Sequence, residues 1–187
     1  MKTLIKTTIL LILLVVMAGA EEITVRLDRI AVLDPSQEDA DNFNRRIAIH
    51  FSLPTQLDSV DADIVYAELH IPFDFSGMII DRNATLELQA YPITTAWIDR
   101  DADWQSPWSS RGGDLDTLSF YTYTINVSDG PDVFLDLTGY VKAVVEGRAE
   151  NFGLMFIPNM HEQRDYDIPQ NLVQQIVDSA RLKIVYH

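Results

Sequence analysis

The stretch Val133-Phe-Leu-Asp-Leu-Thr-Gly-Tyr-Val-Lys-Ala-Val-Val-Glu-Gly147 contains two hydrophobic patterns in succession. Its first five residues place aliphatic side chains on one side and Phe and Asp on the other, which is the period-2 pattern of a strand. Its later apolar residues stand three and four positions apart, which predicts a short α-helix over about residues 139–146. Asp136 or Thr138 is placed to cap the start of this helix, and the glycine at position 147 is placed to end it.

Further strands are predicted on both sides of this helix. Apolar and polar residues alternate over residues 23–28, 46–53, 65–71, 86–90 and 182–186, and an apolar run, Asn151-Phe-Gly-Leu-Met-Phe-Ile157, follows the helix. Many short strands separated by clusters of Asp, Ser, Gly and Pro predict an all-β fold, a single antiparallel β-sandwich of jelly-roll type with one short helix. Residues 169–177 are ambiguous, because their apolar spacing fits a short helix and their composition also fits a loop.

The amino terminus has the composition of a secretory signal peptide. Two lysines precede a short apolar run, and Ala18-Gly-Ala20 matches the small-residue pattern of a cleavage site. The apolar run is shorter than the roughly 20 residues that a membrane-spanning helix needs. The sequence therefore predicts a signal peptide over residues 1–20, one domain over residues 21–187, and no transmembrane anchor after cleavage.

The chain is strongly acidic and contains no cysteine. Removal of residues 1–20 takes away two lysines and no acid, so the net charge of −14 becomes −16. Such a surface repels the phosphates of nucleic acid and suits neutral ligands, cationic ligands or divalent cations. An exported domain without disulfides must be stabilised by its core, which favours a prokaryotic protein that is secreted, held at the cell surface or periplasmic.

Several strand motifs occur in a recognisable order. They are Arg46-Ile-Ala-Ile-His-Phe-Ser-Leu53, Ile64-Val-Tyr-Ala-Glu-Leu-His-Ile71, residues 86–91 followed by Trp97, Trp104, Pro107 and Trp108, Phe134-Leu-Asp-Leu-Thr138 with Val141, Asn151-Phe-Gly-Leu154, and Ala180-Arg-Leu-Lys-Ile-Val-Tyr186. Over about residues 45–186 the chain resembles the DNRLRE domains, a family of secreted β-sandwiches of which some members are classed as carbohydrate-binding modules. The resemblance implies the sandwich fold and a role in carbohydrate binding.

The chain departs from this family in two places. Residues 72–83 look like an insertion between two family strands. An Asp-rich run replaces the Glu and Thr that are usual in the tryptophan-containing loop. This loop is where a function specific to the chain is expected.

The sequence contains no portable catalytic motif. There is no G-x-S-x-G, no cysteine nucleophile and no H-E-x-x-H. His50 and His70 lie on strand faces opposite the apolar residues, which predicts imidazoles on the exterior of the sandwich. Carboxylates are abundant, but only their separation in space could identify a glycosidase pair. We therefore name no catalytic residue and predict a non-catalytic protein.

The run Asp99-Arg-Asp-Ala-Asp-Trp104 is a candidate calcium site. Asp99, Asp101 and Asp103 offer three oxygen donors from one loop, and Ca²⁺ prefers oxygen ligands. The run lacks the glycine of an EF-hand loop. The interpretation that we favour is a solvated turn, in which Asp side chains bond to their own backbone.

Aromatic residues supply candidate ligand-binding positions. Sugar rings have apolar faces that stack on exposed aromatic rings, so Trp104, Trp108, Tyr121 and Tyr123 are candidates. Trp97 is predicted to be in the core, the core is also the favoured position for Trp104, and for Trp108 a core and an exposed position are equally favoured. The two tyrosines share one strand face and Phe120 lies on the other. Either face could be the inner one, and we favour the tyrosines inside.

The leading hypothesis is a secreted, non-catalytic module that binds polysaccharide. The alternative is a structural or adhesive envelope protein that acts through protein–protein contacts. A polysaccharide lyase or hydrolase is a third and less favoured possibility, since no acid and base stand out in the sequence.

Overall fold

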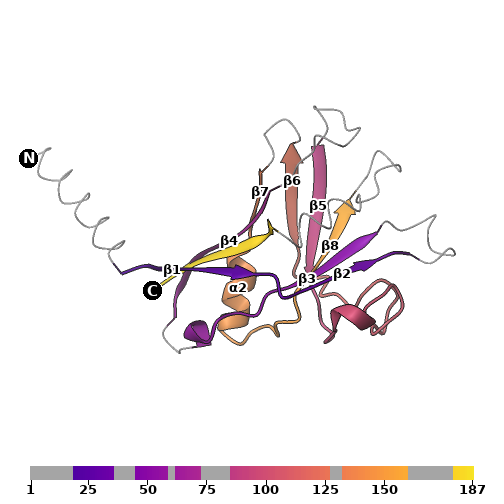
Figure 1. Ribbon diagram of the computed structural model, residues 1–187, viewed down its shortest axis with the longest axis horizontal. Coiled ribbons are helices and arrows are strands. Elements are labelled where there is room, and N and C mark those ends of the chain that lie inside the picture. Colours follow the sequence, from indigo (N-terminus) through magenta and orange to yellow (C-terminus); the bar gives the residue numbers. More distant parts are fainter. Residues whose placement is uncertain (1–18, 36–44, 59–61, 73–84, 127–131, 160–178) are drawn as a thin grey trace, which may run out of the picture.

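The computed structural model of the chain describes residues 19–35, 45–58, 62–72, 85–126, 132–159 and 179–187. Two antiparallel β-sheets form its framework (Figure 1). The four-stranded sheet has the order β1 (Glu21–Arg26), β9 (Arg181–Tyr186), β4 (Ile64–Pro72) and β7 (Asp132–Asp136). The five-stranded sheet has the order β2 (Arg29–Leu33), β3 (Arg46–His50), β8 (Leu154–Asn159), β5 (Thr85–Pro92) and β6 (Tyr121–Asn126). Residues 1–18, most of the predicted insertion and the ambiguous residues 169–177 lie outside the described residues.

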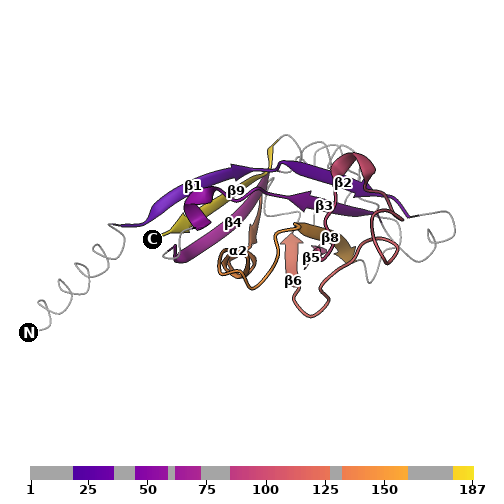
Figure 2. The same cartoon turned by 90° about the horizontal axis from the view of Figure 1, so that it is seen from below.

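The strand order confirms the predicted β-sandwich of jelly-roll type. Each sheet interleaves strands from distant parts of the chain: β1 lies beside β9, and β3 lies beside β8, with every neighbour antiparallel. Two sheets of this interleaved kind are characteristic of a jelly roll. β1 leads into β2 through only Leu27 and Asp28, so the chain passes from one sheet to the other at a single bend (Figure 2).

The predicted helix is present as α2 (Thr138–Val145), one residue earlier than expected at each end. Gly147 ends it with a φ of +69°, the left-handed conformation that favours glycine. The Gly147 N–H bonds to Val144 O and the Arg148 N–H bonds to Ala143 O, which together form a Schellman motif. The glycine stop predicted from the sequence is therefore correct.

The start of α2 is tied to the four-stranded sheet. The Asp136 carboxylate accepts a hydrogen bond from the Thr138 N–H at 2.9 Å. The Thr138 hydroxyl turns away from the helix and accepts a bond of 2.9 Å from the backbone N–H of Ala67 in β4. Asp136 therefore holds the first residue of the helix, while Thr138 joins that helix to the sheet.

The segment Asn151-Phe-Gly153 links the helix to the five-stranded sheet. The Tyr140 hydroxyl on α2 donates to the Asn151 side chain and accepts a bond from the Gly153 N–H. The Asn151 amide in turn donates to the Phe51 carbonyl, just beyond β3. Gly153 has a φ of +90° and passes so close to Ile49 that a Cβ would lie 2.0 Å from its carbonyl oxygen. This position therefore requires glycine.

The space between the sheets holds the main hydrophobic core. Strands of both sheets and α2 contribute to it, and its fully buried members include Ile47, Ile49, Leu69, Ile71, Leu135, Leu137, Val141, Leu154, Leu182 and Ile184. Apart from Val141 of the helix and Leu154 of the apolar run, these are aliphatic residues of the alternating patterns, so the period-2 analysis identified the inner faces of those strands correctly.

A second hydrophobic cluster lies on the outer face of the five-stranded sheet, and we call it the loop core. Its buried members are Ala31, Leu33, Ala48, Ile93, Trp97, Trp104, Trp108 and Met155. Strands β2, β3 and β8 supply the sheet side of the cluster. The other side comes from residues 93–120, which join β5 to β6 and which we call the covering loop. This loop contains the 3-10 helix η3 (Asp99–Asp101) and lies beside β2 and β3 (Figure 1).

Candidate functional site

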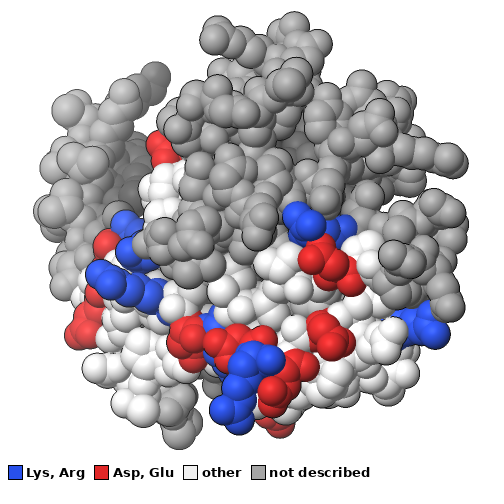
Figure 3. All heavy atoms as spheres, turned by 45° about the vertical axis from the view of Figure 1, so that its right-hand side comes forward, with Lys and Arg blue, Asp and Glu red and all other residues white. Residues whose placement is uncertain are grey.

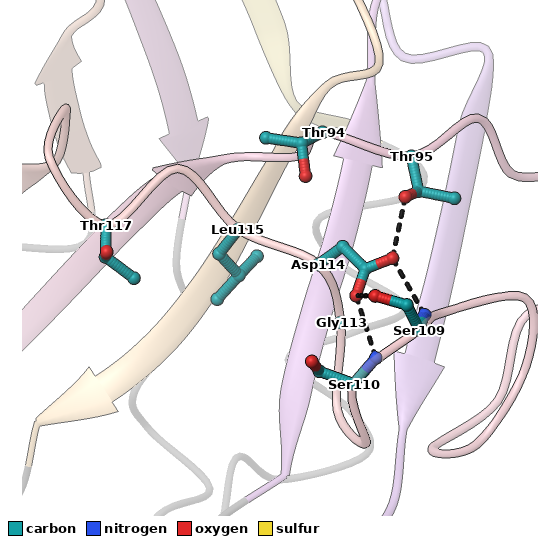
Figure 4. A pocket seen from close by; sticks show the side chains of 8 residues that line it. All are labelled: Thr94, Thr95, Ser109, Ser110, Gly113, Asp114, Leu115 and Thr117. Atoms are coloured by element: carbon teal, nitrogen blue, oxygen red, sulfur yellow. Dashed lines mark hydrogen bonds between the residues drawn. The ribbon is translucent and has the colours of Figure 1, made fainter.

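The covering loop forms a groove of about 470 Å³. The residues that line it are Thr94, Thr95, Ser109, Ser110, Gly113, Asp114, Leu115 and Thr117, most of which carry hydroxyl groups (Figure 4). The two ends of the loop pair with each other, through a bridge between Ile93 and Leu115 and a 2.9 Å bond from the Asp116 N–H to Pro92 O. The groove is therefore built on a paired extension of the β5–β6 hairpin.

Asp114 organises the groove. Its Oδ2 accepts bonds from the Thr95 hydroxyl at 2.7 Å and the Ser109 N–H at 2.8 Å. Its Oδ1 accepts bonds from the Ser109 hydroxyl at 2.7 Å and the Ser110 N–H at 2.8 Å (Figure 4). Burial by itself would raise the pKa of Asp114, but the bonds from these three residues outweigh it and hold the pKa at about 2.

This arrangement suits binding rather than proton transfer. A carboxyl group with a pKa of about 2 is ionised at neutral pH, and the four bonds that Asp114 accepts occupy both of its oxygens. It is therefore a poor general acid or base, since those roles need a pKa near the working pH and a free position. The hydroxyls of Thr94, Ser110 and Thr117, which do not hold Asp114, line the groove and provide donors and acceptors for a polar ligand.

Charge on this side of the molecule is mixed. Figure 3 shows acidic and basic side chains interspersed with uncharged surface on the side that is on the right in Figure 1. The described lining of the groove contains one carboxylate, that of Asp114, and no Lys, Arg or His. The groove itself therefore offers no cation for a phosphate or carboxylate group.

The three tryptophans are buried in the loop core. Trp97, Trp104 and Trp108 are only 3%, 4% and 6% exposed. The indole N–H groups of Trp97 and Trp108 donate to the carbonyls of Phe152 and Asp103, both at 2.7 Å. Trp97 is thus in the interior as predicted. The other two were candidates for stacking on a ligand, and in this structure their rings hold the covering loop on the sheet.

Two arginines add to this packing. The Arg29 guanidinium lies 5.3 Å from the centre of the Trp97 ring, and that of Arg46 lies 4.9 Å from the Trp104 ring, which are cation–π distances. Arg46 also donates to the Gly112 carbonyl at 2.6 Å. The guanidinium groups therefore occupy space beside the indoles where a stacking ligand would have to sit.

The aromatic strand β6 has its tyrosines inside, as the favoured interpretation predicted. Tyr121 and Tyr123 are partly buried against the main core, and the Tyr123 hydroxyl donates to Asp136 O at 2.6 Å. Neither tyrosine ring forms an exposed platform on which a sugar could stack. Phe120, which directly precedes β6, is exposed and stacks on Tyr91 with the ring centres 5.5 Å apart.

Two aspartates of the candidate calcium run accept hydrogen bonds from the backbone of their own loop. The Asp103 carboxylate accepts bonds from the N–H groups of Gln105 and Ser106, both at 2.7 Å, and that of Asp99 accepts from the Arg100 N–H. In the described part of the chain no group of three or more His, Asp or Glu side chains is arranged to hold a metal ion. The geometry does not support a calcium site at Asp99, Asp101 and Asp103. The calcium hypothesis stays a prediction.

His50 differs from its prediction. It lies on the outer face of β3, as expected, but it is only 5% exposed because Asp28 and Asn151 lie against it. Its Nε2 faces the Asn151 carbonyl oxygen at 3.1 Å, and its Nδ1 lies 2.6 Å from Asp28 Oδ1. Ser52 donates to the same carboxylate rather than to the imidazole. In a catalytic triad the serine bonds to the histidine, so these three residues form a structural group.

His70 is on the outer face of the four-stranded sheet and is partly exposed, as predicted. Its ring stacks on Phe134 with the centres 4.6 Å apart, and its Nε2 lies 2.8 Å from Asp132 Oδ1. Phe134 is 56% exposed. This pair is on the opposite sheet from the groove.

Comparison with known proteins adds no family name. No protein-family model and no curated protein matches the chain. None of the described helices is long and apolar enough to cross a membrane.

The sequence analysis singled out this same loop, but for residues other than those that line the groove. It treated Ser109 to Gly113 only as a turn cluster and did not single out Thr94, Asp114 or Thr117. Their chemistry depends on the pairing of residues about 20 positions apart in the loop. A signal was present in the sequence, since Ser109-Ser-Arg-Gly-Gly-Asp114 consists mostly of the Ser, Gly and Asp residues that are typical of tight turns.

Proposed function

We propose that the protein is an exported, non-catalytic module that binds carbohydrate in the groove around Asp114. The observation that supports this most is the lining, in which hydroxyl side chains surround a carboxylate that is fully occupied by hydrogen bonds. Such a surface matches the many hydroxyl groups of a sugar, each of which is both donor and acceptor. The groove volume of about 470 Å³ lies in the range of ligand sites, roughly 300–1,000 Å³.

Two features of the sequence agree with the proposal. Residues 1–20 have the pattern of a signal peptide, which would bring the protein to extracellular glycans. The motifs of the strands and of the tryptophan loop resemble a family that includes carbohydrate-binding modules. The preorganised loop also favours binding, since a ligand would not have to order it.

The test is affinity electrophoresis of the protein with residues 1–20 removed, through gels that contain neutral and acidic polysaccharides. We expect retardation by at least one polysaccharide, and a loss of most of it in the double variant Thr94→Val, Thr117→Val. Valine keeps the shape of threonine and removes the hydroxyl. Thr24→Val, on an exposed residue of β1 far from the covering loop, is the matched control. No retardation in any gel would rule out the proposal.

One observation favours a second candidate, an adhesive or structural role. The outer face of the four-stranded sheet carries exposed Phe134, Tyr66 and Val65, and exposed apolar side chains on one face can mark a protein contact. A stable homo-oligomer in light scattering that becomes monomeric in Phe134→Glu would support this role. A monomer at all concentrations would argue against self-association.

A further inference from the structure

We infer that the groove takes one part of an extended, uncharged glycan chain, and that the next sugar of the chain stacks on Phe120. This inference rests on the proposed function and adds the ligand class and a second subsite to it. It follows from the position of the Tyr91–Phe120 pair, from the way that pair is held, and from the charge around it.

The aromatic pair adjoins one end of the groove. Tyr91 directly precedes Pro92, whose carbonyl accepts the bond from Asp116 that closes the base of the covering loop. Phe120 follows the lining residue Thr117 by three positions. Tyr91 and Phe120 stack on each other from the two segments that meet at the base of the loop, and from this we place the pair next to the Thr117 end of the groove.

The pair is held in place without using its exposed surface. The Tyr91 hydroxyl donates to the Gln89 side chain at 2.8 Å, and the Tyr91 ring covers one side of Phe120 at an interplanar angle of 25°. Phe120 nevertheless remains 51% exposed. Its exposed surface is therefore presented by a fixed ring, which costs a ligand little ordering entropy. Sugars stack on such rings through their C–H faces.

Charge selects the class of glycan. Asp114 lines the groove, and Asp116 follows it two residues later in the chain. Hydrogen bonds from the N–H of Leu118 and the hydroxyl of Ser119 lower the pKa of Asp116, so both carboxylates are ionised at neutral pH. The described groove lining holds no cation to balance a uronate or sulfate. An acidic polysaccharide would meet repulsion from these two carboxylates and from a chain of net charge −14, whereas a neutral one would not.

The structure provides a matched control for the stacking residue. Phe134 is also about half exposed and also stacked on another ring, that of His70, but it lies on the outer face of the opposite sheet. Truncation of Phe120 and of Phe134 removes the same atoms from similarly exposed positions. Only the first should affect a ligand that starts in the groove.

The experiment measures the affinity of the wild-type protein, Phe120→Ala, Phe120→Tyr and Phe134→Ala for neutral polysaccharides, namely soluble β-glucan, xylan and mannan, and for acidic alginate and polygalacturonate. We expect at least one neutral polysaccharide to bind, with a loss of about tenfold or more in Phe120→Ala. Phe120→Tyr, which keeps the ring, and Phe134→Ala should stay within about twofold of the wild type. Circular dichroism and melting temperature check that each variant is folded, and Phe120→Leu replaces Phe120→Ala if the latter is not.

Each contrary outcome has its own meaning. If the wild type binds a neutral polysaccharide and Phe120→Ala binds it equally well, the second subsite is wrong and the proposed function stands. If the wild type prefers alginate or polygalacturonate, the assignment to uncharged glycans is wrong. If no polysaccharide binds at all, the proposed function fails together with this inference.

Discussion

At the scale of single residues, Asp114 shows how a side chain determines the shape of a loop. It joins Thr95, Ser109 and Ser110, which belong to two segments of the covering loop, through four hydrogen bonds. An ionised carboxylate fits this position because both of its oxygens are hydrogen-bond acceptors and neither carries a donor hydrogen. An amide of the same shape would direct donor hydrogens at groups that are donors themselves.

We therefore expect Asp114→Asn to lower stability at pH 7, by roughly 1–2 kcal/mol after allowance for solvent screening. The native pKa of about 2 is below the ordinary 3.8, so the carboxylate contributes stability that is complete above pH 3.8 and lost as the pH falls through about 2. Urea unfolding of both proteins between pH 7 and pH 2 should show the difference shrinking over this window. A difference that is independent of pH would contradict this role.

Gly153 and Gly147 both have positive φ but differ in their surroundings. A Cβ on Gly153 would lie 2.0 Å from the Ile49 carbonyl oxygen, while one on Gly147 would meet no atom within 4 Å. We expect Gly147→Ala to cost about 1–2 kcal/mol through backbone strain alone. Gly153→Ala should cost roughly 3 kcal/mol or more, because β3 must also move. Equal losses in urea unfolding would show that the close approach to Ile49 is not decisive.

The aspartates of the η3 region give a prediction about metal. Asp103 Oδ1 accepts bonds from two backbone N–H groups, which ties this carboxylate to the turn, and the described residues bring no three His, Asp or Glu side chains together to hold a metal ion. We expect the same melting temperature in excess Ca²⁺ and in chelator, since a ligand that binds only the folded state raises it. A clear rise with Ca²⁺ that disappears in Asp101→Asn would instead establish the site that the sequence suggested.

At the scale of elements, the covering loop behaves as a third layer. Its tryptophans fill the outer face of β2, β3 and β8, where the sheet presents small or apolar residues such as Ala31, Ala48 and Met155. Part of this could be predicted, because Leu154-Met-Phe-Ile157 is apolar on both faces, a pattern typical of strands that are covered on two sides. Which segment covers them could not, since that depends on contacts between distant residues.

Tryptophan fluorescence tests this layer. All three tryptophans of the chain are in the loop core, so we expect emission at the short wavelengths of buried indole and weak quenching by iodide. Neither property should change when a glycan binds, because the proposed stacking residue is Phe120. Emission typical of water-exposed indole, or strong quenching in the native protein, would mean that the loop is not packed as described.

At the scale of the whole molecule, the jelly-roll order separates the scaffold from the candidate site. The helix, its glycine stop and the Asn151–Gly153 link fix the packing of the two sheets. The groove lies in a single loop that the sheet supports from one side. Under the proposed function, changes in that loop would alter binding while the main core stays intact, as is usual when function resides in loops.

The sequence by itself determined the elements. Alternation predicted the strands and their inner faces, and the 3.6-residue spacing with Gly147 predicted α2, because these patterns depend on neighbours within a few residues. Tertiary structure alone decided that Trp104 and Trp108, which the sequence offered as ligand-binding candidates, are both interior. They are buried because the covering loop folds back onto the sheet. That contact joins residues far apart in the chain, and no local pattern encodes it.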